Sequence, residues 1–412
     1  MARKKTTTSE MELGSGKELD LEKLANVVGG EILSRMDTVR SWVDTGNLAL
    51  NYSCSGRYMK GGIPVGKLIE IWGNSSSCKT LFAMNFLRGV QRLNGIAAFI
   101  DVENTINATF AERAAHVDTH NVLVIPVEKV DSLQKAFNQI HIILREINKL
   151  YGSERPIIII YDSIAASASE REFAETNIDM FKTTKEAKKE AGVGADKPGE
   201  HAYIIGKELR KLNPVLNKMN ASVVFINQIR EKIGVLYGSN EKKASGGRSL
   251  EYYCSLCIKT KAYKKLKDDR ENIKGMLVSV ENTKNKCFRP FVNAPDNANL
   301  LFDAGIDPLG GLLDCLYKDY RIDKAKNDQG KDKAGWWTVN PKYSDGEEVT
   351  FQASVGKNVV PVDILVKCPK LIDAETGEEV LEYLSSFGNI NTEGYQEQDI
   401  NNDKDIDEDI VG

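Results

Sequence analysis

Short apolar runs alternate with longer amphipathic segments across the middle of the chain, from about residue 58 to residue 302. Apolar runs of this length predict buried β-strands, at residues 67–72, 97–102, 122–126, 157–162, 222–227 and 276–282. Helical periodicity predicts the clearest helices at residues 81–93 and 133–150. Continuous apolar strands separated by helices indicate an α/β fold, in which a mainly parallel, twisted sheet is covered on both faces.

The flanking segments have different patterns. Residues 1–20 are polar, and apolar residues then recur at helical spacing from Leu21 to about Trp42, which predicts an N-terminal helical element. After Gly305 the alternation changes to a small region with Trp336 and Trp337, and the chain ends in an acidic stretch. We therefore expect an N-terminal segment with a helix and linker (1–54), a core (55–305), a small C-terminal domain (306–392) and a disordered acidic tail (393–412).

Composition narrows the class of protein. A net charge of -4 over 412 residues argues against a basic coat, although a local basic groove stays compatible with it. The seven cysteines do not form a disulfide pattern, and Cys254-x-x-Cys257 lacks the second ligand pair of a zinc site. The apolar runs are too short to span a membrane, and no secretion signal precedes them. We expect a soluble protein of a reducing compartment, without a membrane partner.

The stretch GNSSSCKT follows a predicted strand and precedes a predicted helix. It differs from the phosphate-binding pattern G-x-x-x-x-G-K-[ST] at one position, Cys78. The N–H groups of a helix N-terminus bind phosphate, Lys79 would add a positive charge, and the Thr80 hydroxyl would bind Mg²⁺. A cysteine there costs about 1 kcal/mol or more if φ is positive, and little if it is helical. The predicted phosphate-binding residues are Gly73, Asn74, Ser75, Ser76, Ser77, Cys78, Lys79 and Thr80; the alternative is a serine-rich turn.

Polar side chains follow three further predicted strands. Asp162 and Ser163 come directly after the run IIIIY, Glu103 follows AFIDV, and Gln228 ends FINQ. Ligands of α/β proteins bind at the carboxyl ends of strands, so Asp162 is a candidate metal-site acid. Glu103 suits a base or an orienting group for water, and Gln228 suits a contact to a terminal phosphate. The alternatives are a helix cap or surface acid for Glu103 and a satisfied strand-end amide for Gln228.

In this order, GGIPVGKLIEIWGNSSSCKT, AFIDVE, IIIIYDS, FINQIREKIGVLYGS, GGRSLEYYCS and the KNK of TKNKCFRPF resemble the RecA-type recombinases over about residues 55–320. FINQIR-x-KIGV is much more specific than the phosphate-binding stretch alone. The resemblance implies a RecA-type P-loop ATPase core that uses ATP and Mg²⁺, and it makes residues 1–54 an oligomerisation segment. Phage recombinases of the UvsX type similarly lack the second glycine, which favours a virus-encoded or divergent member.

The resemblance also implies roles for single residues. Lys79, Glu103 and Gln228 would take part in hydrolysis, with Glu103 activating the water and Gln228 sensing the γ-phosphate. Thr80 and Asp162 would hold the metal, with Ser163 beside them. Lys284 and Lys286 resemble lysines that reach the ATP of a neighbouring subunit, so the active site would form only in a filament. Asn107 and Phe110 fall where the family places an acid and an aromatic residue against adenine, and Asn107 departs from that pattern.

Two stretches are candidates for DNA contact. Residues 229–247 resemble the second DNA-binding loop of the family. They and the residue that follows include basic side chains that can neutralise phosphates, side chains that can insert between or stack on bases, and flexible glycines, namely Arg230, Lys232, Ile233, Gly234, Val235, Tyr237, Lys242, Lys243, Gly246, Gly247 and Arg248. The other stretch precedes it in the chain, begins near Ala166, and is long and basic. Its lysines at 182, 185, 188 and 189 fit a DNA-contacting face and a solvated helix equally well.

The resemblance therefore implies a DNA-dependent ATPase that forms helical filaments on single-stranded DNA and pairs it with homologous duplex DNA in DNA recombination and repair. Single-strand-binding and mediator proteins are further candidate partners, and the expected location is the cytoplasm of a bacterial or phage-infected cell. Two alternatives stay open: a hexameric RecA-fold helicase, and a DNA-coating protein that has lost hydrolysis. Cys78 motivates the second of these.

Overall fold

The computed structural model describes residues 20–35, 39–170, 199–230, 243–244, 249–268, 270–289, 292, 298–353 and 359–387. The chain divides into two compact units, Met1–Thr38 and Val39–Gly412. The first unit contains α1 (Leu21–Val28) and a short 3₁₀ helix, η1 (Leu33–Arg35). The predicted helical element is shorter than expected, because Gly29 ends α1 in a left-handed conformation with φ 68°. Trp42 starts strand β1 (Trp42–Val43) instead.

Among the described residues, ten strands form one sheet at the centre of the second unit. Six strands run parallel and lie side by side in the order β9 (Leu256–Lys267), β3 (Leu68–Gly73), β7 (Ala221–Arg230), β6 (Ile157–Asp162), β4 (Ile96–Asp101) and β5 (Val122–Ile125). Three more strands continue antiparallel beyond β9, namely β10 (Ile273–Asn285), β11 (Ala298–Leu301) and β12 (Gly305–Ile306). The last, β8 (Lys243–Ala244), pairs with the end of β7. The predicted mainly parallel α/β sheet is confirmed.

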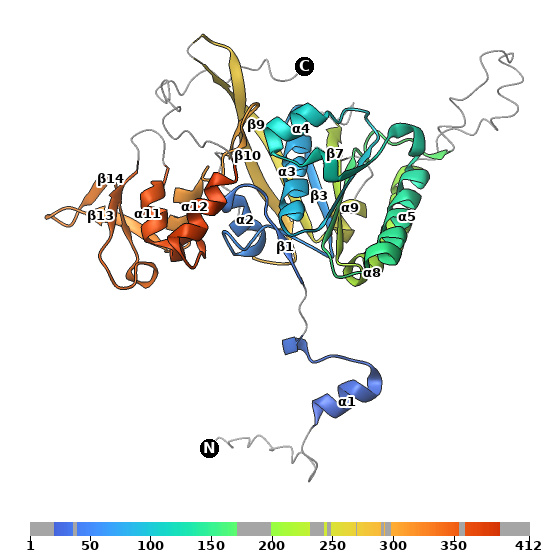
Figure 1. The fold of residues 1–412 in the computed structure, drawn as a ribbon, viewed down its shortest axis with the longest axis horizontal. Helices are drawn as coiled ribbons and strands as arrows, with labels where there is room; N and C mark the ends of the chain where they lie inside the picture. The colour runs from blue at the N-terminus through green and yellow to red at the C-terminus, as the bar shows by residue number, and fades with distance from the viewer. Residues whose placement is uncertain are drawn as a thin grey trace, which may run out of the picture. The chain divides into compact units, whose positions relative to one another are not determined.

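Helices cover both faces of this sheet (Figure 1). One face packs against α3 (Lys79–Arg92) and α4 (Ala108–Ala115), and the other against α5 (Leu133–Tyr151), α8 (Glu200–Lys218) and α9 (Ser249–Tyr253). In β6, Ile158 and Ile160 face the first layer while Ile157 and Ile159 face the second. Two covered faces explain why the strands are apolar throughout. Short 3₁₀ helices, η2 (Thr119–Asn121) and η3 (Val127–Lys129), flank β5.

The C-terminal region builds a third hydrophobic core with an N-terminal helix. Helix α2 (Leu48–Ser55), which precedes β2 (Ile63–Pro64), contributes Leu48, Ala49 and Tyr52 to it. The C-terminal elements are α10 (Leu312–Lys318), β13 (Ile322–Lys326), β14 (Asp332–Val339), η4 (Pro341–Tyr343), β15 (Thr350–Gln352), α11 (Val362–Lys367), η5 (Pro369–Ile372) and α12 (Gly377–Ser385). The three strands form a separate antiparallel sheet. The boundaries at 306 and 392 stay predictions. No helix in the described part of the chain is long and apolar enough to cross a membrane.

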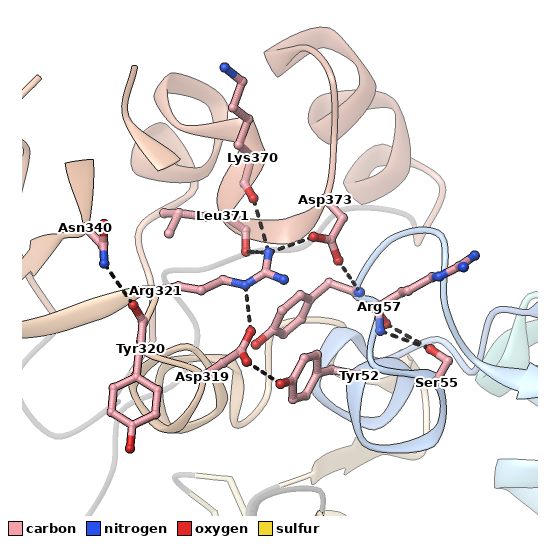
Figure 2. Close-up of polar contacts among 11 residues, drawn as sticks. Tyr52, Ser55, Arg57, Asp319, Tyr320, Arg321, Asn340, Lys370, Leu371 and Asp373 are labelled. Carbon is pink, nitrogen blue, oxygen red and sulfur yellow. Dashed lines mark hydrogen bonds and ion pairs between the residues drawn. The ribbon is translucent and has the colours of Figure 1, made fainter. Parts of the chain in front are cut away.

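Arg321 ties this region together (Figure 2). Its side chain is 9% exposed, and it donates to Asp319 and to Asp373 at 2.7 Å each. The guanidinium carbon lies 4.6 Å from the ring centre of Tyr58 and 4.9 Å from that of Tyr343. Arg321 also donates to the carbonyl oxygens of residues 370 and 371. The planar guanidinium fits this site because it offers donors in its plane and its faces to aromatic rings.

The two carboxylates extend the cluster to the N-terminal side of the fold. Asp373 accepts from the backbone N–H of Tyr58 at 2.8 Å, and Asp319 accepts from the hydroxyl of Tyr52. Both tyrosines belong to the segment that contains α2, and their rings stack with centres 4.5 Å apart. One buried cation therefore fixes the C-terminal region against the segment that leads into the central sheet.

Replacing Arg321 with Met should lower the free energy of unfolding by about 2–3 kcal/mol. This is below the full cost of breaking a buried ion pair, because both carboxylates keep part of their contact with water. Urea unfolding measures the change. Lys326→Met is the control, since it breaks an exposed pair with Asp332 and should leave the unfolding free energy nearly unchanged. Equal losses in the two variants would contradict the role given to Arg321.

Candidate nucleotide-binding site

The loop between β3 and α3 is packed tightly against β9. A Cβ atom at Gly73 would lie 2.3 Å from the carbonyl oxygen of Thr260 and 2.7 Å from the Ser77 hydroxyl. Both distances are far inside van der Waals contact, so only glycine allows the strand and the loop to approach this closely. The Ser77 hydroxyl in turn donates to the carbonyl of Asn74 at 2.8 Å and lies 2.9 Å from the Thr260 hydroxyl.

Cys78 adopts a left-handed backbone conformation, with φ 63° and ψ 21°. Of the two conformations considered from the sequence, the structure has the costly one, because a Cβ is disfavoured at positive φ. The residue is nevertheless the N-cap of α3, and its side chain packs partly buried against the core beneath that helix. Burial raises the pKa of the Cys78 thiol to about 11, so the thiol is neutral at physiological pH.

The ammonium of Lys79 is turned back into this loop. The residue is 7% exposed, and its Nζ donates to the carbonyl oxygens of Asn74 at 2.6 Å and Gly73 at 3.3 Å. Burial lowers the pKa of Lys79, while the carboxylates of Asp162 and Glu103 oppose that shift. A buried cation at the N-terminus of a helix, held only by neutral carbonyl oxygens and nearby acids, is a binding position for an anion.

Thr80 and Asp162 form the second part of the site. The Thr80 hydroxyl donates to the Asp162 carboxylate at 2.6 Å. Burial raises the pKa of Asp162 to about 6, aided by the charges of Glu103 and Asp101 and opposed by the Thr80 hydrogen bond. A hydroxyl and a carboxylate oxygen are ligands that Mg²⁺ prefers. The negative charges that disfavour ionised Asp162 would be offset by such a cation, so the residues present fit the metal.

Glu103 connects two strand ends. Its carboxylate accepts from the hydroxyl of Ser163, after β6, and from the Nε2 of Gln228, on β7, at 3.2 Å. The loop that carries Glu103 is shaped by Asp101, which accepts from the backbone N–H groups of residues 105 and 106 at 3.0 Å each. The helix-cap alternative for Glu103 is wrong, because Asn107 caps α4 and the Glu103 carboxylate accepts from two side chains instead. The Gln228 amide donates to Glu103, which fits both a phosphate-contacting residue and a satisfied strand-end amide.

These groups surround one cavity of about 290 Å³, which is near the small end of the range for ligand pockets. Its lining includes most of the predicted residues, namely Ser75, Ser76, Ser77, Cys78, Lys79, Thr80, Glu103, Phe110, Asp162 and Gln228. Gly73, Asn74 and Ser163 join it through the contacts described above. Asn107 has a local role, because its side chain caps α4 by accepting from Phe110 N at 3.0 Å.

Sequence reasoning missed four lining residues, Leu81, Ile226, Leu300 and Phe302. Ile226 had a signal, since it lies two residues before Gln228 on the same strand and therefore on the same face. Leu300 and Phe302 come from β11 and the residue that follows it. They reach the cavity because β10 and β11 continue the sheet antiparallel beyond β9. No local sequence pattern predicts this long-range pairing.

Lys284 and Lys286 lie away from this cavity. Lys284 is opposite Cys257 on β9, and Cys257 is opposite Glu70 on β3, roughly 10 Å along the strand before Gly73. Both ammonium groups donate to the Tyr252 carbonyl at the end of α9, at 3.1 and 3.3 Å. Within one chain the two lysines lie toward the end of the sheet at which the parallel strands begin, whereas the cavity lies where these strands finish. They would therefore need a second copy of the chain to meet a nucleotide.

Of the predicted DNA loop, the structure describes only residues 229, 230, 243 and 244. Arg230, at the end of β7, pairs with Lys243 in β8 through the backbone. This ladder closes the loop two residues after Gln228. Lys232, Ile233, Gly234, Val235, Tyr237, Lys242, Gly246, Gly247 and Arg248 lie outside the described residues, as do the basic stretch at 171–198 and the acidic tail.

Comparison with known proteins gives a consistent result. A family model described as RecA N-terminal domain matches residues 21–307. The RecA protein of Cytophaga hutchinsonii is 30% identical over 364 residues, which cover 85% of this chain and 93% of that protein. The RecA protein of Symbiobacterium thermophilum is 30% identical over 366 residues, or 85% and 91%. The RecA protein of Caulobacter vibrioides is 33% identical over 283 residues, or 69% and 70%.

The left-handed turn predicts that Cys78→Gly is more stable than Cys78→Ala by about 1 kcal/mol. Both variants lose the thiol, but only glycine removes the Cβ that is strained at positive φ. The greater freedom of glycine in the unfolded chain offsets part of the gain. Denaturant unfolding without nucleotide provides the comparison. An alanine variant as stable as the glycine variant would contradict this prediction, because the Cβ strain would then be no larger than the entropic cost of glycine.

Proposed function

This chain belongs to the RecA family, and on that premise we propose that it is a DNA-dependent ATPase that forms helical filaments on single-stranded DNA and catalyses homologous pairing and strand exchange. One observation carries the proposal: the cavity that suits a nucleotide contains Gln228, and the strand of Gln228 leads within two residues into the closed loop expected to bind DNA. A signal from the nucleotide therefore has a short covalent path to that loop. The viral origin stays a prediction.

The nucleotide would be ATP, bound by its phosphates at the N-terminus of α3. Lys79 would exchange its two carbonyl contacts for phosphate oxygens. These would give the buried ammonium an anionic hydrogen-bond partner. Thr80 and Asp162 would hold Mg²⁺, which when bound draws charge from the phosphate oxygens. Phe110 is 39% exposed at the cavity, and its ring can pack against the base.

Hydrolysis would use Glu103 as the group that orients water and accepts its proton. Its hydrogen bonds from Ser163 and Gln228 hold the carboxylate in place before the substrate arrives. When the amide of Gln228 turns to a γ-phosphate, Glu103 loses one of those donors and becomes a better base. Loss of the phosphate returns the amide to Glu103, and β7 carries this change toward the DNA loop.

The filament would complete the site. Lys284 and Lys286 would leave the carbonyl of Tyr252 and reach the nucleotide of an adjacent copy. Of the predicted oligomerisation segment 1–54, only the first unit, residues 1–38, would pack on a neighbour, because β1 and α2 are built into the second unit of the same chain. Single-stranded DNA would be held by its backbone, with its bases free to pair with a homologous duplex. Phosphate contacts from the loop lysines and arginines make such binding sensitive to salt. Single-strand-binding and mediator proteins would act on this filament in a bacterial or phage-infected cytoplasm.

ATP turnover should rise strongly with single-stranded DNA at low salt and lose that stimulation at high salt. In Glu103→Gln, turnover should fall roughly 10²–10⁴-fold, because the amide cannot accept the proton of water. The measurement is phosphate release across a salt series, together with DNA binding. Glu128→Gln is the control, since it neutralises an exposed carboxylate away from the cavity.

Each outcome has a clear meaning. Persistent turnover in a folded, DNA-binding Glu103→Gln variant would remove Glu103 as the base. Tight DNA binding without turnover in the unmodified chain would favour the coating protein. Closed rings in electron micrographs would favour the helicase.

The position of the two lysines predicts complementation between variants. Lys284→Ala/Lys286→Ala and Lys79→Ala should each be nearly inactive alone, because the first lacks the lysines given to a neighbour and the second lacks its own phosphate site. A mixture should recover part of the turnover, since some interfaces join an intact cavity to intact lysines. Turnover in the mixture equal to the mean of the two separate variants would contradict an active site shared between copies.

A further inference from the structure

Glu70 is a buried carboxylate in the middle of the central sheet. It lies on β3 between Leu68 and Trp72, is 3% exposed, and is flanked by Phe225 on β7 and Cys257 on β9. It faces α9 and the apolar core on that side rather than the cavity. An ionised carboxylate there is costly unless hydrogen bonds compensate for the lost water, and burial raises the pKa of Glu70 while hydrogen bonds from Asn227 and Cys257 lower it.

The strongest of its described contacts leads to the strand of Gln228. Asn227 is fully buried, and its Nδ2 donates to the Glu70 carboxylate at 2.8 Å. The Oδ1 of the same amide accepts from the backbone N–H of Gln228 at 2.9 Å. The accepting oxygen of Glu70 and the donating N–H of Gln228 together fix which end of the Asn227 amide faces each of them.

This arrangement supports the part of β7 after Phe225, which no longer pairs with β6. Strand β6 pairs with β7 only as far as Tyr161 and Phe225, and β3 ends at Gly73, opposite Gln228. The backbone N–H of Gln228 is therefore satisfied by a side chain instead of by the β6 ladder. The side chain of Gln228 then reaches Glu103 at 3.2 Å in the cavity, so one series of hydrogen bonds runs from Glu70 to Glu103.

We propose that Glu70 is a positioning residue for the ATPase reaction, which acts through the Asn227 amide to hold the Gln228 backbone so that its side chain stays at the cavity, where it donates to Glu103 and from where it would turn to a γ-phosphate. This inference rests on the proposed function and adds to it a residue outside the cavity. Glu70 touches no reacting atom, so its loss should change the rate of hydrolysis and not the binding of ATP. Removing its carboxylate lets the Asn227 amide turn, and Gln228 then spends less time in place.

The test combines Glu70→Leu with Gln228→Ala in a double-mutant cycle on the full chain. Leucine fills similar space and accepts no hydrogen bond, so DNA-stimulated kcat should fall about tenfold with KM for ATP changed less than about twofold. In the Gln228→Ala background, Glu70→Leu should have little further effect on kcat, because both substitutions act on the same group, the side chain of Gln228. Glu70→Met provides the same test if the leucine variant does not fold by circular dichroism.

Ser222→Ala is the matched control. Ser222 is also fully buried on β7, and its hydroxyl donates to the carbonyl of Pro64 at 2.9 Å. It lies at the opposite end of the strand, so its loss should lower stability without changing the kcat of a Gln228-dependent reaction.

The outcomes separate this inference from the function on which it rests. An unchanged kcat in Glu70→Leu, an equal fall in Ser222→Ala, or a full further tenfold fall in the Gln228→Ala background would each overturn the inference alone. An unaltered kcat in Gln228→Ala would also overturn it, because there would be no contact for Glu70 to support. Absence of turnover in the unmodified chain would overturn the proposed function and this inference with it.

Discussion

The ammonium of Lys79 is removed from water and held by two carbonyl oxygens of the loop that it closes. This is the interaction on which the rest of the site depends, because it needs the loop to turn sharply between β3 and α3. That sharp turn requires a residue without a side chain at position 73, where β9 passes, and a left-handed backbone conformation at Cys78. The two carbonyl oxygens and the nearby carboxylates offset part of the cost of burying the cation, and a bound anion would offset more of it. A loop of this kind is therefore shaped as an anion-binding position.

The parallel sheet brings the remaining groups to that loop. Asp162 ends β6 and Glu103 lies two residues after the end of β4, where the two strands pair as far as Asp101 and Asp162. Gln228 lies on β7 opposite Gly73. Their charges and amides meet where the strands end and the backbone ladder no longer satisfies every polar group. The same loss of ladder partners creates the site and requires side chains such as Asn227 to support it. Buried polar groups behind the cavity are therefore part of its construction.

The groups at strand ends could be predicted from the sequence because each lies directly after an apolar run or within three residues of its end, as Asp162 follows Ile157–Tyr161. The conformation of Cys78 could not be, since a cysteine is compatible with both a helical and a left-handed N-cap, and only the packing of the loop decides between them. Leu300 and Phe302 were missed for a different reason. They enter the cavity through the antiparallel strands β10 and β11, whose order in the sheet is set by long-range pairing. Glu70 also escaped notice, because one acid inside an apolar strand is a weak signal without its partner.

Helix α3 is fixed at both of its ends, and this links the C-terminal region to the nucleotide. Lys79 and Thr80 hold its first turn, while Arg88, which is 5% exposed, donates from its last turns to the carbonyl of Ser386 at 3.1 Å. The same guanidinium lies 3.8 Å from the ring centre of Phe387, just after α12. Helix α12 belongs to the core that Arg321 stabilises. Any tilt of α3 would therefore disturb both the contacts around Lys79 and this C-terminal core. On the proposed function, a helix held in this way would keep its N-terminus in place during hydrolysis, and β7 would be the element that responds to the nucleotide.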